Sequence, residues 1–434
     1  MVVRRLRRIT VNQDRRRVVV TGMGILCPTG NTVEEAWSNA AAGKTGIQYI
    51  QRFDTSHIEI HFGGEVKNFD PEAFLGRREA RRTDRVTQMA LFAAEQAIKD
   101  SGLVVTDENR YDIAVIVGSG IGGIQSLLES IRVFLERGSR AVSPLMVPMM
   151  LPDSPCSKIS MTYGLRGPNF AISTACATGN NSIGEAAEMI RRGQVTTALA
   201  GSSEAGLVDV ALAGFNNMTA LSQRNSDPER ASRPFDIDRD GFVCAEGSAI
   251  LVLEELETAK ARGAKIYAEI LGYGHTSDAY HVTAPLETGE GAAKAIEFAL
   301  KDAGITPQDI DYINAHGTST PLNDKSETLA LKKALGEQAY EIPISSTKSV
   351  TGHLMGAAGA VEAVFSIKAL LEDFIPPTVN LDNQDPDCDL NYTPLVGKPH
   401  PIKTVMSNSF GFGGHNAVLI FGEYQENSST NGHK

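Results

Sequence analysis

The sequence predicts an α/β protein built from two copies of one folding unit. Short apolar segments typical of strands alternate with amphipathic helical segments, and the uniformly apolar strands favour a parallel sheet covered on both faces. Two pairs of segments match in the same order: residues 94–103 resemble 296–305, and residues 173–179 resemble 346–352, with Ser349 in the place of Cys176. We infer a duplicated α/β unit; chance similarity between helices rich in alanine and glycine is the alternative.

Composition narrows the class of protein. The chain has 434 residues, 42% of them hydrophobic and 21% charged, and it contains no apolar run long enough to cross a membrane. Its net charge of −11 argues against nucleic acid as the main partner. Five cysteines without CxxC spacing indicate reduced thiols and a cytoplasmic location.

The expected elements follow one another in a regular order. We expect a basic arm at residues 1–17 that is not a secretory signal, a first half at 18–264, a second half at 265–423 and a disordered polar tail at 424–434. The first half should contain strands at 18–22, 112–117, 167–172, 196–200 and 248–253, and helices at 34–42, 84–100 and 181–193. Residues 138–166, rich in proline and methionine, are expected to be an inserted and partly irregular segment. The second half begins near residues 265–273 and contains a further strand at 310–317.

Cys176 lies where strand 167–172, expected to be buried, turns into helix 181–193. The first turn of a helix presents unpaired backbone N–H groups and the positive end of the helix dipole. Such a turn can receive an oxyanion, and it should lower the pKa of a thiol below its free value of about 8.5. The arrangement is that of a nucleophile elbow. Taken alone, the segment is more often that of a small buried thiol, because buried cysteines are common.

Polar residues occupy comparable strand ends in the second half. His316 follows an apolar strand, and Lys348 and His353 flank the repeated segment 346–352. One such histidine would more often be structural, but two histidines, a lysine and a cysteine at corresponding strand ends indicate a site. A zinc cluster is the alternative, although neither an HExxH motif nor paired cysteines support it.

A glycine-rich loop offers a different reading. Gly118, Gly120 and Gly123 fit the dinucleotide fingerprint G-x-G-x-x-G after a strand. That strand lies beyond residue 110 and after a full helix, not in the opening unit of the chain. We therefore favour a tight turn beside a pocket.

Together these segments resemble the β-ketoacyl-[acyl-carrier-protein] synthases over residues 18–423. The resemblance rests on four motifs in the family's order: the Cys176 turn, the His316 segment, the Lys348/His353 segment and the loop around Phe412. Residues 376–383 and 388–390 resemble the type II synthase more than type I. The resemblance implies a thiolase-like fold, in which duplicated α/β halves form a five-layered α-β-α-β-α sandwich.

The resemblance also implies a reaction. Cys176 would hold an acyl group as a thioester, malonyl-carrier protein would lose CO2, and the resulting enolate would attack the acyl group. The backbone N–H groups of Cys176 and Phe412 would form the oxyanion hole, and His316 and His353 would stabilise the enolate through Nε2. No organic cofactor or metal is required.

Further roles come from the same resemblance. Lys348 would order the site through the carboxylates of Asp324 and Glu327. The remaining expected contacts are Thr318 and Thr320 with the pantetheine arm, Ile121 with the acyl chain, Phe412 as a gate, and Arg78, Arg81, Arg82 and Arg140 with acyl carrier protein. The protein is expected to be a homodimer.

Other functions stay open at this point. A type I synthase or a polyketide ketosynthase would have the same fold. A thiolase would need a second catalytic cysteine near the C-terminus, where only Cys388 lies, and a non-catalytic chain-length factor would lack Cys176. A dinucleotide-binding oxidoreductase would rest on the glycine loop alone.

Overall fold

The computed structural model describes residues 15–425, so most of the predicted basic arm and polar tail lies outside the described residues. Of that arm, Arg17 is ordered against the body, where its Nε donates to Glu269 at 2.8 Å. Within 15–425, no helix is both long and apolar enough to span a membrane.

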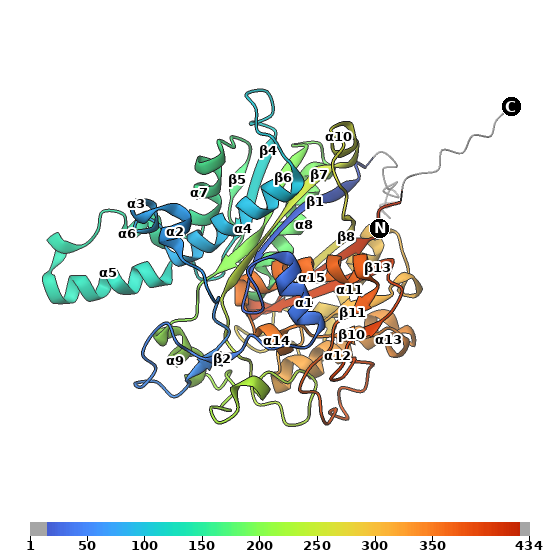
Figure 1. Ribbon diagram of the computed structural model, residues 1–434. Helices are drawn as coiled ribbons and strands as arrows, with labels where there is room; N and C mark the ends of the chain where they lie inside the picture. Colours follow the sequence, from blue (N-terminus) through green and yellow to red (C-terminus); the bar gives the residue numbers. More distant parts are fainter. Residues whose placement is uncertain (1–14, 426–434) are drawn as a thin grey trace, which may run out of the picture.

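The chain consists of two halves with the same strand order (Figure 1). The first half runs β5-β4-β6-β7-β1, and the second runs β10-β9-β13-β14-β8. The strands of the first half are β1 (Val18–Leu26), β4 (Ile113–Gly118), β5 (Asn169–Phe170), β6 (Thr197–Glu204) and β7 (Gly247–Glu255). Those of the second half are β8 (Ala268–Ser277), β9 (Tyr312–Asn314), β10 (Ile344–Ser345), β13 (Thr404–Gly411) and β14 (His415–Gly422). This shared order confirms the predicted duplication, and the two halves join where β1 pairs with β8.

The expectation of a parallel sheet is wrong in part. In each half the two outer pairs are parallel, as in β4 with β5 and β6. The pairs toward the centre are antiparallel, as in β7 with β6 and β1. Uniformly apolar strands report burial of both faces, and an antiparallel pair that is covered on both faces gives the same pattern.

Helices form three layers around the two half-sheets. α4 (Arg85–Ser101) and α7 (Ser154–Tyr163) cover the outer face of the first half, and α11 (Glu290–Ala303) packs on β8 and β14 of the second, with α12 (Pro321–Leu335) beside it. α8 (Thr178–Arg191) and α15 (Ala358–Glu372) pack against each other between the half-sheets. The largest apolar core surrounds this central pair. The predicted five-layered sandwich is therefore confirmed.

Local sequence explains where α4 begins and ends. The side chain of Asp84 accepts from the N–H of Val86 at 3.0 Å, and Gly102 ends the helix in a left-handed conformation with φ of 63°.

Shorter elements complete the chain: α1 (Val33–Ala41), β2 (Gln48–Tyr49), β3 (Phe62–Gly63), α2 (Pro71–Leu75), α3 (Arg77–Ala80), α9 (Asp209–Asn217), α10 (Leu256–Ala261), α13 (Gln338–Glu341), α14 (Lys348–Thr351), β11 (Phe374–Ile375) and β12 (Lys398–Pro399).

The segment around residues 124–170 differs from the expectation. α5 (Ile124–Arg137) and α6 (Met146–Met150) reach away from the body, and neither buries a residue (Figure 1). Strand 167–172 was expected to be buried, but β5 is exposed at both residues and pairs with β4 alone. Phe170 therefore lies at a free sheet edge and not in the core.

The central helices α8 and α15 begin in the same way. Each follows a 3₁₀ turn whose first residue, Ala175 or Met355, has φ of 48°. The counterpart of Cys176 in the second half is therefore Gly356. The sequence predicted that Ser349 corresponds to Cys176. That correspondence is wrong because Ser349 lies in α14, one short helix before the turn.

Candidate active site

A cavity of about 540 Å³ opens between the two halves at the start of the central helices. It is lined by seven of the predicted site residues: Ile121, Cys176, His316, Thr318, Thr320, His353 and Phe412. The structure thus brings together residues separated by almost 300 positions in the sequence. Lys348 is not among the residues that line this cavity, and its side chain is 1% exposed.

The turn that carries Cys176 is built under strain and held on both sides. Ala175 has a positive φ, which an L-residue adopts only at a cost of about 1–3 kcal/mol. The N–H of Thr174 donates to Thr178 Oγ1 at 2.9 Å, and Asn181 donates to Thr174 Oγ1 at 2.8 Å. These bonds aim the thiol into the cavity at the N-terminus of α8.

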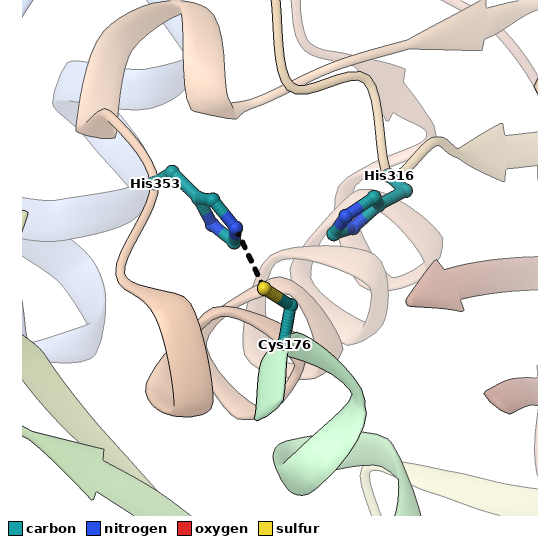
Figure 2. A group of neighbouring side chains, drawn as sticks. All are labelled: Cys176, His316 and His353. Atoms are coloured by element: carbon teal, nitrogen blue, oxygen red, sulfur yellow. Dashed lines mark hydrogen bonds between the residues drawn. The ribbon is translucent and has the colours of Figure 1, made fainter. Parts of the chain in front are cut away.

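Cys176, His316 and His353 converge on one point (Figure 2). Nε2 of His353 lies 3.0 Å from the Cys176 Sγ, and the two imidazole rings are nearly perpendicular with centroids 5.4 Å apart. Burial and the nearby Lys348 charge hold the pKa of both histidines well below 6.5, so both rings are neutral.

The tautomer of His353 follows from a backbone contact. The N–H of Met355 donates to the Nδ1 of His353 at 3.3 Å, so Nδ1 must be unprotonated. The proton of the neutral ring then sits on Nε2, which faces the cavity. His353 is therefore a hydrogen-bond donor to a group bound beside Cys176.

The same contact weighs against a metal centre. The ligand atoms of Cys176, His316 and His353 lie within 4.8 Å of one another, close enough to surround an ion. A metal ion needs a lone pair on the ring nitrogen that binds it. The Nε2–H tautomer of His353 has none to offer toward the cavity, so the geometry favours binding an oxyanion.

The expectation of a lowered thiol pKa is wrong for the unliganded site. Burial raises the pKa of Cys176 to about 11, although the Lys348 charge and the N–H of Phe412 both lower it. The cost of desolvating a thiolate exceeds these stabilising contributions. The N–H of Phe412 nevertheless contacts the sulfur, so it lies within reach of an oxyanion that forms beside Cys176.

Lys348 does not pair with Asp324 and Glu327 as expected. Its Nζ bonds the carboxylate of Glu362 in α15, and both side chains are fully buried. Burial raises the pKa of Glu362 to about 7 despite this pairing. The sequence held a signal for this partner, because Glu362 is the one acidic residue in the first three turns of a strongly apolar helix.

Asp324 and Glu327 instead brace the backbone around His316. Glu327 accepts from the N–H groups of His316 and Gly317 at 2.8 and 2.7 Å, and Asp324 accepts from the N–H of Thr318 at 3.0 Å. Burial raises the pKa of both carboxyls, that of Glu327 to about 7. Both residues belong to the site, but as supports of the histidine loop.

The threonines and Phe412 occupy the walls of the cavity. Thr318 Oγ1 and Thr320 Oγ1 lie 2.8 Å apart, which presents a pair of hydroxyls to a bound ligand. Phe412 approaches the Cys176 turn because Gly411 has no side chain: a Cβ there would lie 2.9 Å from the Cys176 nitrogen. Gly413 follows in a left-handed conformation with φ of 83°.

The glycine loop cradles a carboxylate of the chain itself. The N–H groups of Gly120 and Ile121 donate to Glu204 at the end of β6, at 2.8 and 3.3 Å. An internal anion therefore fills the position that a pyrophosphate would take in a dinucleotide site. Sequence reasoning missed Glu204, although an acidic residue at the end of an apolar strand was a visible signal.

The predicted docking arginines are exposed and separate from the cavity. Arg78 lies in α3, and Arg81 and Arg82 follow it, all on the surface. They lie before α4, which begins only at Arg85. Arg140 is exposed in the 3₁₀ turn Ser139–Ala141.

Comparison with known proteins agrees with this geometry. Residues 15–259 match the model of the β-ketoacyl synthase N-terminal domain, and residues 267–382 match that of its C-terminal domain. The chain belongs to the β-ketoacyl synthase family. Cys388 does not line the cavity of this family member, so the cavity lacks the second cysteine that a thiolase needs.

Relatives of this β-ketoacyl synthase family member match along nearly their whole length. It is 50% identical over 414 residues to 3-oxoacyl-[acyl-carrier-protein] synthase 2 of Synechocystis sp., covering 95% of this chain and 100% of the relative. It is 49% identical over 410 residues to the enzyme of the same name from Staphylococcus aureus, covering 94% and 99%.

Two solved structures show the same fold. One is a type II polyketide acyl-carrier protein in complex with its ketosynthase bound to the hexaketide, with a TM-score of 0.88, 37% identity, and coverage of 95% of this chain and 100% of the other. The other is a β-ketoacyl synthase from Burkholderia phymatum, with a TM-score of 0.87, 37% identity, and coverage of 94% and 100%.

Proposed function

We propose that the protein is a 3-oxoacyl-[acyl-carrier-protein] synthase of the type II class that extends a carrier-bound acyl chain by two carbons. The observation that carries the proposal is the convergence of a thiol and two neutral histidines on one cavity. A thiol can hold the acyl group, and two N–H donors can stabilise the enolate that forms when CO2 is lost.

The proposed reaction has two halves. Cys176 attacks the acyl thioester of the carrier, and the N–H groups of Cys176 and Phe412 receive the oxyanion. The thiol proton leaves on the pantetheine sulfur of the departing carrier. Malonyl-carrier protein then binds and loses CO2, and its enolate oxygen accepts from Nε2 of His353 and of His316. The enolate carbon attacks the carbonyl carbon of the acyl-enzyme, the bond from that carbon to the Cys176 sulfur breaks, and the β-ketoacyl carrier leaves. The released Cys176 thiolate takes a proton from water.

The other predicted roles form part of this proposal. Thr318 and Thr320 bind the pantetheine arm, and Ile121 contacts the acyl chain. Glu362 holds Lys348 in place, and the Lys348 charge adds to the effect of burial in keeping both histidines neutral. Phe412 moves on the glycines beside it to admit the acyl chain.

The partner of the enzyme is acyl carrier protein, as the solved complex of a 37% identical ketosynthase supports. Docking would use Arg78, Arg81, Arg82 and Arg140. We further propose a homodimer, because β5 leaves a sheet edge open beside the exposed apolar side chain of Phe170. The five free cysteines favour a reducing compartment such as the cytoplasm.

One experiment tests the activity. The purified protein is incubated with an acyl-carrier and malonyl-carrier protein, and CO2 and the β-ketoacyl product are measured. One equivalent of CO2 per single two-carbon extension supports the proposal. Repeated extension without reduction would favour a polyketide ketosynthase, and absence of CO2 release would exclude a decarboxylating synthase.

A further inference from the structure

Glu204 is a fully buried carboxylate that no predicted role uses. It ends β6 at 0% exposure, beside the cavity that holds Cys176. Oε1 accepts from Ser119 Oγ at 3.0 Å and from the N–H of Ile121 at 3.3 Å. Oε2 accepts from the N–H of Gly120 at 2.8 Å and from that of Gly356 at 3.2 Å.

These four donors come from two different loops. Ser119, Gly120 and Ile121 belong to the glycine loop that follows β4, where Ile121 lines the cavity. Gly356 belongs to the 3₁₀ turn Met355–Ala357, which begins the second central helix. The carboxylate therefore ties a wall of the acyl cavity in the first half to the histidine turn of the second.

Both loops are shaped around this carboxylate. A Cβ on Gly120 would lie 2.8 Å from Oε2, and a Cβ on Gly356 would lie 2.5 Å from it. The side chains of Met355 and Ile121 also meet over Gly206, just beyond Glu204. A Cβ on Gly356 would also lie 2.5 Å from the backbone nitrogen of Gly120, so only glycine fits at that position.

The turn that Glu204 holds is the one that sets the His353 tautomer. Gly356 is directly bonded to Met355, whose N–H donates to His353 Nδ1. A shift of the turn would lengthen that contact of 3.3 Å and release the ring to place its proton on Nδ1. Nε2 would then lose the hydrogen that faces the reacting groups.

We propose that Glu204 is a positioning residue that fixes the acyl-cavity wall and the His353 tautomer with one carboxylate. The inference rests on the proposed function, because it assigns Glu204 to the enolate-stabilising step of that reaction. Burial raises the pKa of Glu204 to about 7, since none of its four donors carries a full charge. Burying the Glu204 carboxylate is therefore unfavourable, but its hydrogen bonds hold the two loops of the site in place.

The test compares Glu204→Gln with Glu246→Gln. Glutamine keeps one acceptor oxygen but turns an NH₂ group toward at least one backbone N–H donor, whichever way the amide is oriented. Glu246 is equally buried and binds Arg85 at 2.6 Å away from the cavity, so its variant reports the cost to the fold of losing a buried carboxylate. Ser119→Ala removes one donor and keeps the carboxylate, which serves if Glu204→Gln fails to fold.

For Glu204→Gln we expect decarboxylation kcat to fall by about 10²-fold, the scale for a displaced catalytic group, with the KM for malonyl-carrier nearly unchanged. The acylation ratio between long and short chains should also change, because Ile121 loses its support. Ser119→Ala should change the decarboxylation kcat and the acylation ratio in the same directions but by smaller factors. Nitrogen-15 chemical shifts of His353 should report Nε2–H in the wild type and a growing Nδ1–H fraction in the variants.

A chemical rescue completes the test. Glu204→Gly leaves a cradle of N–H groups that formate can occupy, and added formate should restore part of the lost decarboxylation. The inference is overturned if Glu204→Gln matches Glu246→Gln in chain ratio and kcat, or if the His353 tautomer stays unchanged. The tautomer measurement needs no turnover, so it separates a failure of this inference from a wild type that does not condense malonyl-carrier.

Discussion

The backbone N–H of Met355 lies 3.3 Å from the Nδ1 of His353 and donates to it, which places the ring proton on Nε2. Because Nε2 is then a donor, His353 is suited to stabilise an enolate rather than to take the proton of Cys176. The two half-reactions should therefore depend on different residues, and they can be separated by mutation.

His353→Ala should still accept an acyl group at Cys176. Its release of CO2 from malonyl-carrier should fall by about 10²–10³-fold, the scale for removing one oxyanion donor. Radiolabelled CO2 and acyl-enzyme are measured in the same preparation. An equal collapse of both half-reactions would show that the histidine activates the thiol instead.

Cys176→Ala should lose acyl transfer entirely while keeping the fold. Mass spectrometry after incubation with acyl-carrier should find the adduct on Cys176 alone, because the other four cysteines are buried and none lies in the cavity lining. Thermal unfolding serves as the control for folding. An adduct on another cysteine of the variant would contradict the assignment.

The reactivity of Cys176 should rise with pH well into the alkaline range. Burial raises its pKa to about 11, above the ordinary value, so the protonated form predominates at neutral pH and the thiolate fraction grows about tenfold per pH unit below that pKa. Iodoacetamide alkylation between pH 7 and 10 measures this, with Cys176→Ala as the blank. A plateau near pH 7 would mean that the helix dipole and Lys348 outweigh burial.

Phe412→Ala should alter entry of the acyl chain. The ring stands beside Cys176 on a backbone of glycines, so its removal should slow acylation or loosen chain selection while malonyl-carrier binding stays near normal. Acylation rates are compared across short and long chains, with the exposed and remote Phe298→Ala as control. Equal rates for every chain length would remove Phe412 as a gate.

Charge reversal at Arg78 and Arg82 should weaken carrier recognition. The chain carries −11 overall, so attraction of an acidic carrier needs a local positive patch within a Debye length of about 8 Å. The apparent KM for carrier-bound substrates should rise, and its salt dependence should flatten. A pantetheine thioester without carrier should turn over normally. If both substrates suffer alike, the arginines support the fold.

The sequence predicted which residues meet at the active site, but it did not predict the direction of the Cys176 pKa shift or the partner of Lys348. Cys176, His316 and His353 follow strands or begin helices, and those local patterns are enough to bring them to one edge. The sign of the Cys176 pKa shift depends on how completely the cavity is desolvated, which only packing decides. The partner of Lys348 was missed because Glu362 lies in a different helix from Asp324 and Glu327.

The edge strand β5 shows a second limit. A short segment such as 167–172 can have the same composition in a core and at an open edge, so its sequence did not show that β5 is exposed. The mixed strand directions escaped prediction for a similar reason, since burial and not direction sets the apolar pattern. The sequence predicted the repeat but not that Gly356 corresponds to Cys176. That correspondence depends on the backbone angles of the two turns, which the residue types do not indicate.

The matching turns at the starts of α8 and α15 also mean that the catalytic residues are encoded in both halves of the gene. The nucleophile comes from the portion that encodes β1 to β7, and both imidazoles come from the portion that encodes β8 to β14. Neither portion translated alone would contain a reaction centre. Two separately expressed fragments, cut between Glu255 and Ala268, should therefore gain activity only when they are mixed and reassemble across the β1–β8 seam.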